Sequence, residues 1–264
     1  VTHIPFPLDT HWLAIARDDG FLAAAVAEFV RDGLERREAA VLVASARRWR
    51  LIRAELEALG DDVSTAMDDG KLVILDTTAT LGRMSIGGQV EPSRLATELL
   101  PVIDRVRAAN DAAQVRVYSE FLDALWSRRS FDLVAQLENA WHELLKVESI
   151  TLLCAYNLDP LDERKDPSQL MGLCRAHGHV HAAQDSARRG EAIRRAMDDV
   201  LGIREVGRLQ MVLAAAGLPS GDKGTAELTL LWLRTQVPHL AHRVLIQTCR
   251  LLEEGQMPLA VAAT

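Results

Sequence analysis

Polar residues follow several short apolar runs of the chain, and their types suit the binding of a ligand. The residues and their runs are Ser45 and Arg47 after VLVA, Asp76 after KLVIL, Glu120 after VRVYS, and Cys154 and Tyr156 in ITLLCAY. If the runs are parallel strands, their carboxyl ends lie at one edge of a sheet, where ligands bind in open α/β folds. The sequence therefore predicts one crevice surrounded by a carboxylate pair, a thiol and a phenol.

Structural roles explain the same residues without a ligand. Glu120 and Asp76 are placed to cap the helices that follow them, or to pair with an arginine such as Arg128. Cys154 fits a small buried apolar residue better than a nucleophile, because the sequence fixes no lysine or histidine beside it. Both interpretations of the carboxylates stay open, whereas the structural interpretation is preferred for the thiol.

Two tryptophans and a histidine-rich segment add further candidates. Trp126 and Trp141 are candidate ligand contacts, although packing between a helix and the sheet explains them more simply. His177, His179 and His181 alternate in HGHVH, a spacing that chelates a metal only from an extended segment. Without a nearby acidic or cysteine cluster, we prefer a boundary segment that seals the domain, and we predict no metal site.

The apolar patterns between these residues predict strands that alternate with helices. Buried strands are expected at residues 39–45, 71–78, 114–120 and 149–158, and amphipathic helices at residues 21–38, 47–60, 91–111 and 131–148. Gly60 suits a left-handed cap after the second helix, and Pro101 marks a point where the third helix can break. Repeated strand, helix, strand units predict a three-layer α/β domain with a mostly parallel sheet over residues 1–185.

The chain changes character after residue 185, because residues 186–264 show helical patterns alone. This all-helical region is expected to serve signalling or dimerisation. Its apolar side chains make a broad surface, formed by Leu228, Leu231, Leu233, Val237, Leu240, Val244, Leu245 and Leu251. So few residues cannot easily bury that surface alone. The surface is therefore expected to pack on the α/β domain or on a second copy, which predicts a homodimer.

Charge and composition argue against several classes of protein. The formal net charge of -7 is unsuited to direct nucleic-acid binding, which needs clustered Lys and Arg. No apolar run reaches the roughly 20 residues that cross a bilayer, so we expect a cytoplasmic protein without membrane contact. The three cysteines, Cys154, Cys174 and Cys249, have no CxxC spacing, which argues against a disulfide framework or a zinc site.

The turn after the first predicted strand tests for nucleotide chemistry. A P-loop needs glycines followed by Lys and Ser or Thr, whereas this turn reads ASARRWR. The glycines of LGRMSIGG lack the spacing of a dinucleotide fingerprint. ATP hydrolysis is therefore disfavoured and no cofactor is predicted. A degenerate ATPase that uses Glu120 and Asp76, or a thiol chemistry at Cys154, remains an alternative.

Four blocks of the sequence together resemble the MEDS family, the methanogen/methylotroph, DcmR-type sensory domain. The blocks begin at HWLAIARDDG, RVYSEFLDALW, AWHELLKVESITLLCAY and LCRAHGHV, and the resemblance covers about residues 10–183. It implies an α/β core that is similar to RecA or KaiC without the P-loop, and a sensor of small hydrocarbon derivatives in prokaryotic signalling and transcription control. Carried over by position, it points to His11, Glu120, Trp126, Trp141, Cys154, Tyr156, His177 and His179.

These observations lead to the hypothesis of a non-enzymatic regulator. Its sensory domain binds a small molecule near Glu120, and its C-terminal helices transmit occupancy to a signalling partner such as a kinase, a response regulator or a sigma-factor regulator. A ligand-free interaction scaffold is the first alternative. A second alternative arises because HLAHRVLIQTCRLL resembles the phosphoacceptor helix of some histidine kinases, with His242 as the phosphoacceptor for a separate kinase.

Overall fold

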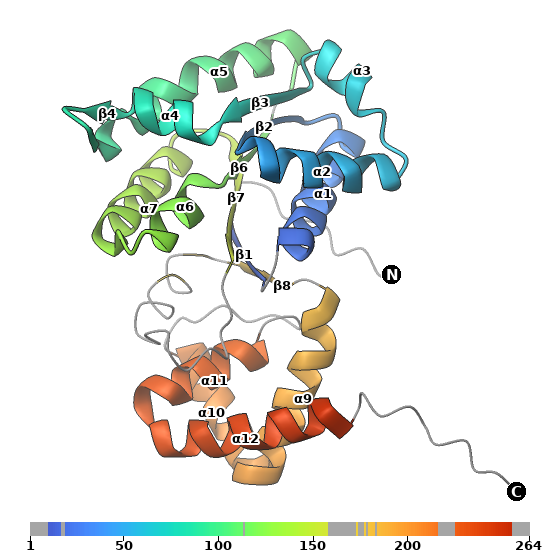
Figure 1. Cartoon of the computed structure of the whole chain (residues 1–264), viewed down its shortest axis with the longest axis vertical. Helices are drawn as coiled ribbons and strands as arrows, with labels where there is room; N and C mark the ends of the chain where they lie inside the picture. The colour runs from blue at the N-terminus through green and yellow to red at the C-terminus, as the bar shows by residue number, and fades with distance from the viewer. Residues whose placement is uncertain are drawn as a thin grey trace, which may run out of the picture. The chain divides into compact units, whose positions relative to one another are not determined.

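The chain forms two compact units, which the computed structural model in Figure 1 shows. The structure describes residues 10–16, 19–112, 114–157, 173, 177, 179–182, 184–215 and 225–254. The α/β unit comprises Val1–Leu158 and His177–Ala183, and the helical unit comprises Asp159–Ala176 and Gln184–Thr264. No helix in the described part of the chain is long and apolar enough to cross a membrane.

A six-stranded sheet forms the centre of the α/β unit, with the strand order β3-β2-β6-β7-β1-β8. Every pair of neighbouring strands is parallel. The strands are β1 (His11–Ala16), β2 (Ala39–Ala44), β3 (Leu72–Asp76), β6 (Val115–Ser119), β7 (Ile150–Asn157) and β8 (His179–Ala182). Because all the strands run the same way, their carboxyl ends lie at one edge of the sheet. Helices lie in the connections from β1 to β2, β2 to β3, β3 to β6 and β6 to β7.

Helices cover both faces of this sheet (Figure 1). They are α1 (Asp19–Glu35), α2 (Ala46–Ala58), α3 (Val63–Asp68), α4 (Thr77–Arg83), α5 (Leu95–Asn110), α6 (Phe121–Ser127) and α7 (Phe131–Leu145). One hydrophobic core lies between the sheet and the helices α1 and α2, and it includes Leu22, Phe29 and Ile52. The alternate side chains of the strands point to the other face, where α5, α6 and α7 pack. The predicted three-layer α/β fold with a parallel sheet is confirmed.

The sheet has two strands that the apolar patterns did not predict. In β8, HVHA, histidines alternate with apolar residues, so it does not read as the continuous apolar run expected of a buried parallel strand. β1, HWLAIA, is a short apolar run after His11 that was not assigned to a strand. The predicted helix at residues 91–111 begins as a 3-10 turn, Pro92–Arg94, and continues as α5 through Pro101 without a break. Gly87 and Gly88 form the turn of a small hairpin between β4 (Ser85–Ile86) and β5 (Gln89–Val90).

The helical unit has a hydrophobic core of its own. Its helices are α9 (Gln184–Leu201), α10 (Ile203–Ala215), α11 (Thr225–Gln236) and α12 (Pro238–Glu254). Ile193, Met197, Leu230, Leu233 and Val244 are all buried in this core. The expectation that the apolar surface needs an outside partner is therefore wrong for Leu233, Val244 and Leu245.

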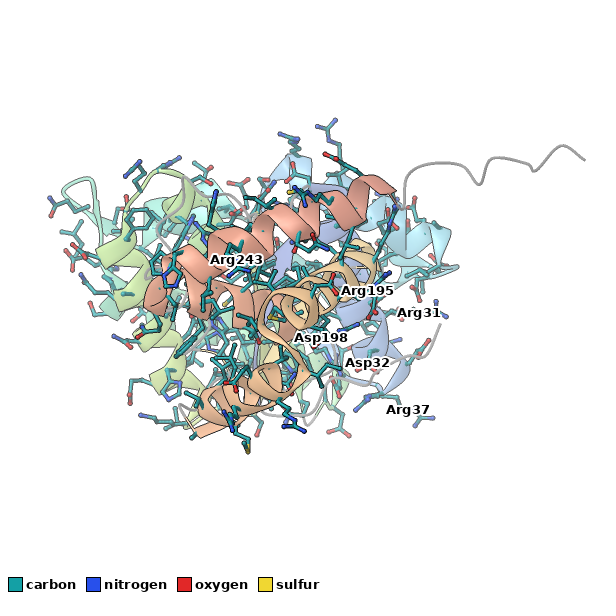
Figure 2. All side chains as sticks on the ribbon, turned by 90° about the horizontal axis from the view of Figure 1, so that it is seen from below. Arg31, Asp32, Arg37, Arg195, Asp198 and Arg243 are labelled. Carbon is teal, nitrogen blue, oxygen red and sulfur yellow. The ribbon has the colours of Figure 1, made fainter. Side chains whose placement is uncertain are left out.

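Helices α9 and α12 pack against each other and turn charged residues outward. Exposed residues on them include Arg195 and Asp198 of α9 and Arg243 of α12, which Figure 2 labels. The division of apolar and charged residues on these helices follows the 3.6-residue period of amphipathic helices. The two helices thus bury an apolar face and expose a charged face to solvent.

Candidate functional site

The structure brings several of the predicted site residues, together with residues that were not predicted, into two polar groups within the α/β unit. The first, here called the arginine network, consists of Asp19, Ser45, Arg48, Thr77, Glu120 and Asp123. The second, here called the buried cluster, consists of His11, Glu138, Cys154 and His177. The sequence had predicted a single crevice containing members of both groups.

Glu120 lies between β6 and α6 and is buried, with 8% of its surface exposed. Its carboxylate accepts hydrogen bonds from the backbone N–H of Ser45, from the Ser45 hydroxyl at 2.9 Å and from the Thr77 hydroxyl at 3.1 Å. It makes no side-chain cap for α6. An arginine lies beside it, as one structural interpretation expected: this is Arg48, with Nε 3.6 Å from Oε1, where Arg128 had been the example. The carboxylate therefore ties together the segments that follow β2, β3 and β6.

Arg48 is the central cation of the arginine network. It lies in the first turn of α2, with a side chain that is 5% exposed, and its Nη2 is 3.0 Å from Asp19 and 3.3 Å from Asp123. Although burial opposes the charge, these carboxylates and Tyr118 raise the pKa of the guanidinium. The Nη1 atom is buried and donates no hydrogen bond to a described residue. One donor at the carboxyl edge of the sheet thus lacks an acceptor in the described part of the chain.

Asp123 is a carboxyl group of the arginine network whose pKa is raised. Burial raises its pKa, and the charges of Glu120 and Asp19 act in the same direction. The hydrogen bond from the backbone N–H of Asn157 and the positive charge of Arg48 oppose this shift. The Asn157 N–H donates to Asp123 Oδ1 at 2.9 Å. This residue was not among the sequence-based candidates, although it follows Glu120 by three residues on α6.

The other predicted members of this edge have structural contacts. Asp76 is exposed and caps α4 by accepting from the Ala79 N–H at 2.8 Å, which confirms the capping alternative. Ser45 caps α2 through Arg48 N at 3.3 Å. Arg47 has a side chain that is 75% exposed and pairs with Asp19 at 2.7 Å. A ligand role for these residues remains a prediction.

The buried cluster lies on the face of the sheet that packs against α7. His11 pairs with Leu152 across β1 and β7, so the side chain of Cys154, two residues along β7, points to the same face. His11 Nε2 is 3.2 Å from Cys154 Sγ and 3.4 Å from Glu138 Oε2. His177 Nε2 is 3.5 Å from Glu138 Oε1, and the two imidazole rings lie 3.9 Å apart. His11 thus lies beside Cys154, although the sequence alone gave no histidine next to this thiol.

Burial disfavours the charged forms of the cluster residues. It raises the pKa of Cys154 well above its ordinary value, and the nearby Glu138 adds to the shift. Burial also raises the pKa of Glu138, although His177 and Tyr156 oppose the change. The pKa of His11 falls well below its ordinary value because of burial and the neighbouring His177 and His142. A carboxyl, a thiol and two imidazoles thus meet where water does not reach them.

Tyr156 contacts this group, and the two predicted tryptophans pack against other aromatic rings. The Tyr156 hydroxyl donates to Glu138 Oε1 at 2.5 Å. Trp126 contacts the rings of Phe131 and Tyr156 edge-on, and Trp141 stacks on Phe121. Both tryptophans are buried, as core packing requires. Their role as ligand contacts remains a prediction.

Three other candidates remain. His179 and His181 lie on β8, of which the structure describes the backbone alone. His242 is exposed on α12 in the helical unit. Its role as a phosphoacceptor remains a prediction.

Glu138 was missed by sequence reasoning, although a signal for it was present. On α7 the buried residues Val134, Leu137, Trp141 and Leu144 define the apolar face, and Glu138 lies on that same face. A single carboxylate on the apolar side of an amphipathic helix needs a polar partner, because an isolated buried charge is costly. Its partners come from β1, β7 and the segment before β8, which no local pattern identifies.

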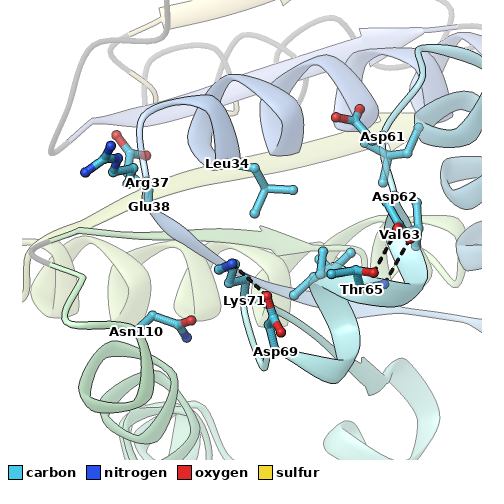
Figure 3. Close-up of a pocket in the computed structure, with 13 residues that line it drawn as sticks. Leu34, Arg37, Glu38, Asp61, Asp62, Val63, Thr65, Asp69, Lys71 and Asn110 are labelled. Atoms are coloured by element: carbon cyan, nitrogen blue, oxygen red, sulfur yellow. Dashed lines mark hydrogen bonds and ion pairs between the residues drawn. The ribbon is translucent and has the colours of Figure 1, made fainter.

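An open pocket of about 470 Å³ lies at the opposite edge of the sheet, near the starts of β2 and β3 (Figure 3). Glu38, Asp61, Asp69 and Lys71 are among its polar lining residues. Most of these polar groups have structural contacts: Lys71 pairs with Asp69 at 2.7 Å, and Asp62 caps α3 through Thr65 (Figure 3). Burial raises the pKa of Asp61. The pocket thus lies away from every residue predicted to bind a ligand.

Comparisons with known proteins identify the family of this chain. A family model described as MEDS, the MEthanogen/methylotroph, DcmR Sensory domain, matches residues 10–178, which is more than half of the 264 residues. The chain belongs to the MEDS family. The resemblance found in the sequence is thereby confirmed, and the MEDS family is a sensory-domain family associated with signalling. The match includes both the arginine network and the buried cluster.

Structural comparison of this MEDS protein gives a more distant similarity. A KaiC-like protein from the hyperthermophilic archaeon Pyrococcus horikoshii OT3 is 22% identical, with a TM-score of 0.38. The match covers 58% of this chain and 65% of that chain, so the MEDS protein spans less than two thirds of that structure. The comparison with curated proteins gave no match.

Proposed function

We propose that this MEDS protein is a non-enzymatic signalling regulator whose α/β unit binds a small molecule at the arginine network. The ligand that this site suits carries an acceptor oxygen, as short alcohols, aldehydes and carboxylates do. The helical unit then passes the bound state to a partner protein in signalling or transcription control. The sensory character of the family supports this proposal.

The observation that carries the proposal is the environment of Arg48. Its side chain is 5% exposed, and its Nη1 atom makes no hydrogen bond among the described residues. A buried donor without an acceptor costs about 1–3 kcal/mol or more, and the cost is higher for a charged group. A ligand oxygen at this position would remove that cost. The site also lies at the carboxyl edge of a parallel sheet, where ligands of α/β proteins bind.

Transmission requires that the ligand prefers one arrangement of the protein over another. A ligand with equal affinity for two arrangements shifts neither population, however tightly it binds. The helical unit is suited to an output role because α10 exposes Ile203, Met211 and Val212 to solvent. Such apolar side chains are available to a partner protein or to a second copy of the chain.

Two features argue for binding rather than catalysis. Cys154 is fully buried, and burial raises the pKa of its thiol, whereas a catalytic cysteine needs an accessible thiolate. Both Cys154 and Glu138 approach the same ring nitrogen of His11, whereas a nucleophile, base and orienting acid use the two different nitrogens. A phosphate-release assay with Mg-ATP tests the ATPase alternative, and sustained turnover that Glu120→Gln abolishes would establish it instead.

Isothermal calorimetry of the full chain with short alcohols, aldehydes and carboxylates tests the binding site. We expect Arg48→Lys to weaken binding by about tenfold or more, because lysine keeps the charge but loses the planar fork of donors. Arg53→Lys is the matched control, since Arg53 lies on the same helix, is exposed and pairs with Glu57 at 2.7 Å. Circular dichroism of each variant verifies folding.

The outcomes of this experiment separate the candidate functions. Equal affinity of the wild type and the Arg48→Lys variant would remove the arginine network as the site. Absence of binding by every compound would favour the ligand-free scaffold. Proteins that co-purify with the full chain, but not with a chain that ends at residue 185, would then be candidate partners of the helical region.

A further inference from the structure

We propose that His11, Glu138, Cys154 and His177 form a binding site for a divalent transition-metal ion of the zinc type. This inference goes beyond the sensor function and does not depend on it, because it concerns the buried cluster and not the arginine network. The four residues come from β1, α7, β7 and the segment before β8. The fold therefore assembles them from four separate parts of the α/β unit.

Distances between the ligand atoms support four-coordinate binding. One atom from each of the four residues lies within 4.8 Å of all the others. His11 Nε2 lies 3.2 Å from Cys154 Sγ and 3.4 Å from Glu138 Oε2. His177 Nε2 lies 3.5 Å from the other carboxylate oxygen, Glu138 Oε1. Ligands held at about 2.0–2.3 Å from one tetrahedral ion are separated by about 3.3–3.8 Å. Small side-chain adjustments would therefore bring all four atoms onto one ion.

Charge balance also suits a divalent ion. Two neutral imidazoles, one thiolate and one carboxylate carry a total charge of -2, which a single divalent cation neutralises. All four residues are buried, with exposed fractions of 7% for His11, 4% for Glu138, 0% for Cys154 and 3% for His177. A buried group of net zero charge avoids the large cost of placing an uncompensated charge away from water.

The atoms of Glu138 are arranged as in a supported metal ligand. Its Oε1 atom accepts the hydrogen bond of Tyr156 at 2.5 Å, whereas its Oε2 atom is buried and makes no hydrogen bond among the described residues. Metal-bound carboxylates are commonly held by such an outer hydrogen bond, which fixes their orientation. An ion would supply the partner that Oε2 lacks.

The types of the ligands select the class of metal. Thiolate and imidazole favour zinc and the neighbouring transition ions, whereas magnesium and calcium prefer oxygen ligands. A set of four protein ligands without an exposed position is typical of closed zinc sites. The ion is therefore expected to hold β1, α7 and β7 together, and the site is not expected to carry out hydrolysis.

Metal analysis of the full chain tests this proposal directly. The tag-free protein, kept reduced and incubated with Zn²⁺, is dialysed and its metal content measured by elemental analysis and native mass spectrometry. We expect one ion per chain, which Cys154→Ser and Glu138→Gln each reduce by more than tenfold. The matched controls are Cys249→Ser, an exposed thiol on α12, and Glu143→Gln, an exposed residue on α7, and both should retain the ion.

Cobalt gives a second readout that reports the ligands themselves. Co²⁺ bound to a thiolate shows a near-ultraviolet charge-transfer band, which should be present in the wild type and in Cys249→Ser and absent in Cys154→Ser. Glu138→Gln should keep the thiolate band if any Co²⁺ remains. Circular dichroism shows whether each variant is folded, and if Cys154→Ser unfolds, Cys154→Ala and Glu138→Gln decide the question.

The results have clear meanings for both proposals. Absence of a stoichiometric ion in the wild type, or an ion retained by folded Cys154→Ser and Glu138→Gln, would overturn the metal site. A failure of this kind leaves small-molecule binding at Arg48 unaffected. Loss of ligand binding in Arg48→Lys with the ion still present would conversely show that the two sites are separate.

Discussion

Tyr118 and Tyr156 are both fully buried, yet their hydroxyl groups have opposite surroundings. The Tyr156 hydroxyl donates to Glu138, whereas the Tyr118 oxygen has no hydrogen-bond partner among the described residues. A buried polar group without a partner costs about 1–3 kcal/mol, and the same group with a partner contributes to stability. The same substitution at the two positions should therefore have opposite effects.

We expect Tyr118→Phe to raise the free energy of unfolding by about 1 kcal/mol at neutral pH, because it removes an unpaired buried hydroxyl. Tyr156→Phe is the control and should lower it by about 1–3 kcal/mol, because Glu138 then loses its donor. Urea denaturation measures both values. Destabilisation of similar size in the two variants would contradict the expected difference.

Tyr118 also makes the free energy of unfolding depend on pH. Burial raises the pKa of the Tyr118 phenol, and Glu120 and Asp123 add to the shift while Arg48 opposes it. The folded protein then keeps a proton that the unfolded chain loses above a pH of about 10. The free energy of unfolding is therefore unaffected by this group below that pH and falls as the pH rises above it. Tyr118→Phe should therefore lose less stability than the wild type between about pH 9.5 and 11.

Single residues of the candidate sites were predictable from the sequence in three ways. Glu120 and Cys154 were identified because each lies at or near the end of an apolar run, His177 from the alternating histidines of HGHVH, and His11 through the family resemblance. Arg48 and Glu138 were not, because each lies on a helix and acquires its partners from distant segments. The contacts that make these residues notable depend on how helices pack on the sheet, which local sequence does not determine.

At the scale of elements, Arg116 joins β6 to α1 through a buried group of charges. It is fully buried, with Nη2 2.6 Å from Asp32 and Nε 2.5 Å from Glu38, and its Nη1 donates to the carbonyl oxygen of Phe29. Gly33 lies directly against this side chain, since a Cβ there would be 2.6 Å from Arg116 Cδ. The contact depends on the absence of a side chain at residue 33.

We expect Gly33→Ala to lower the free energy of unfolding by about 1–3 kcal/mol, because Arg116 is held on three sides and cannot move away. The overlap should outweigh the gain in helix propensity of about 1 kcal/mol. Gly82→Ala on α4 is the control: a Cβ there would meet nothing within 4 Å, so that variant should be neutral or slightly stabilised. Thermal denaturation compares them, and equal stability of both variants would argue against the close contact.

Elements were predictable where one physical signal dominated. The four apolar runs became β2, β3, β6 and β7, since buried parallel strands need continuous apolar sequence. β8 was missed because its histidines interrupt this pattern, whereas β1 was missed although the apolar run Trp12–Ala16 follows its single histidine. Pro101 remains inside α5, so packing of the helix on the sheet outweighs the lost backbone hydrogen bond.

At the scale of the whole molecule, each unit has a core of its own, which predicts that damage to one core stays local. Leu230 is fully buried in the core of the helical unit. We expect Leu230→Ala to destabilise that unit by about 2–5 kcal/mol. Hydrogen exchange measured by mass spectrometry should show faster exchange in α9, α11 and α12 and unchanged exchange in β2 and β6.

The control for this prediction is Met211→Ala on α10, since Met211 is exposed and contributes little to packing. Its exchange should match that of the wild type in both units. An equal increase of exchange throughout the chain in Leu230→Ala would instead indicate that the two units unfold together.

The strand order has a consequence for how the protein is made. β1 is synthesised before the other described strands of this sheet, but its neighbours are β7 and β8, which follow it by more than 130 residues. The contact between His11 and His177 therefore cannot form until residue 177 has been synthesised. Such distant pairing is slow and exposes the nascent chain to aggregation. Translation rate and chaperones should accordingly affect the yield of this protein more than they affect proteins whose adjacent strands are neighbours in sequence.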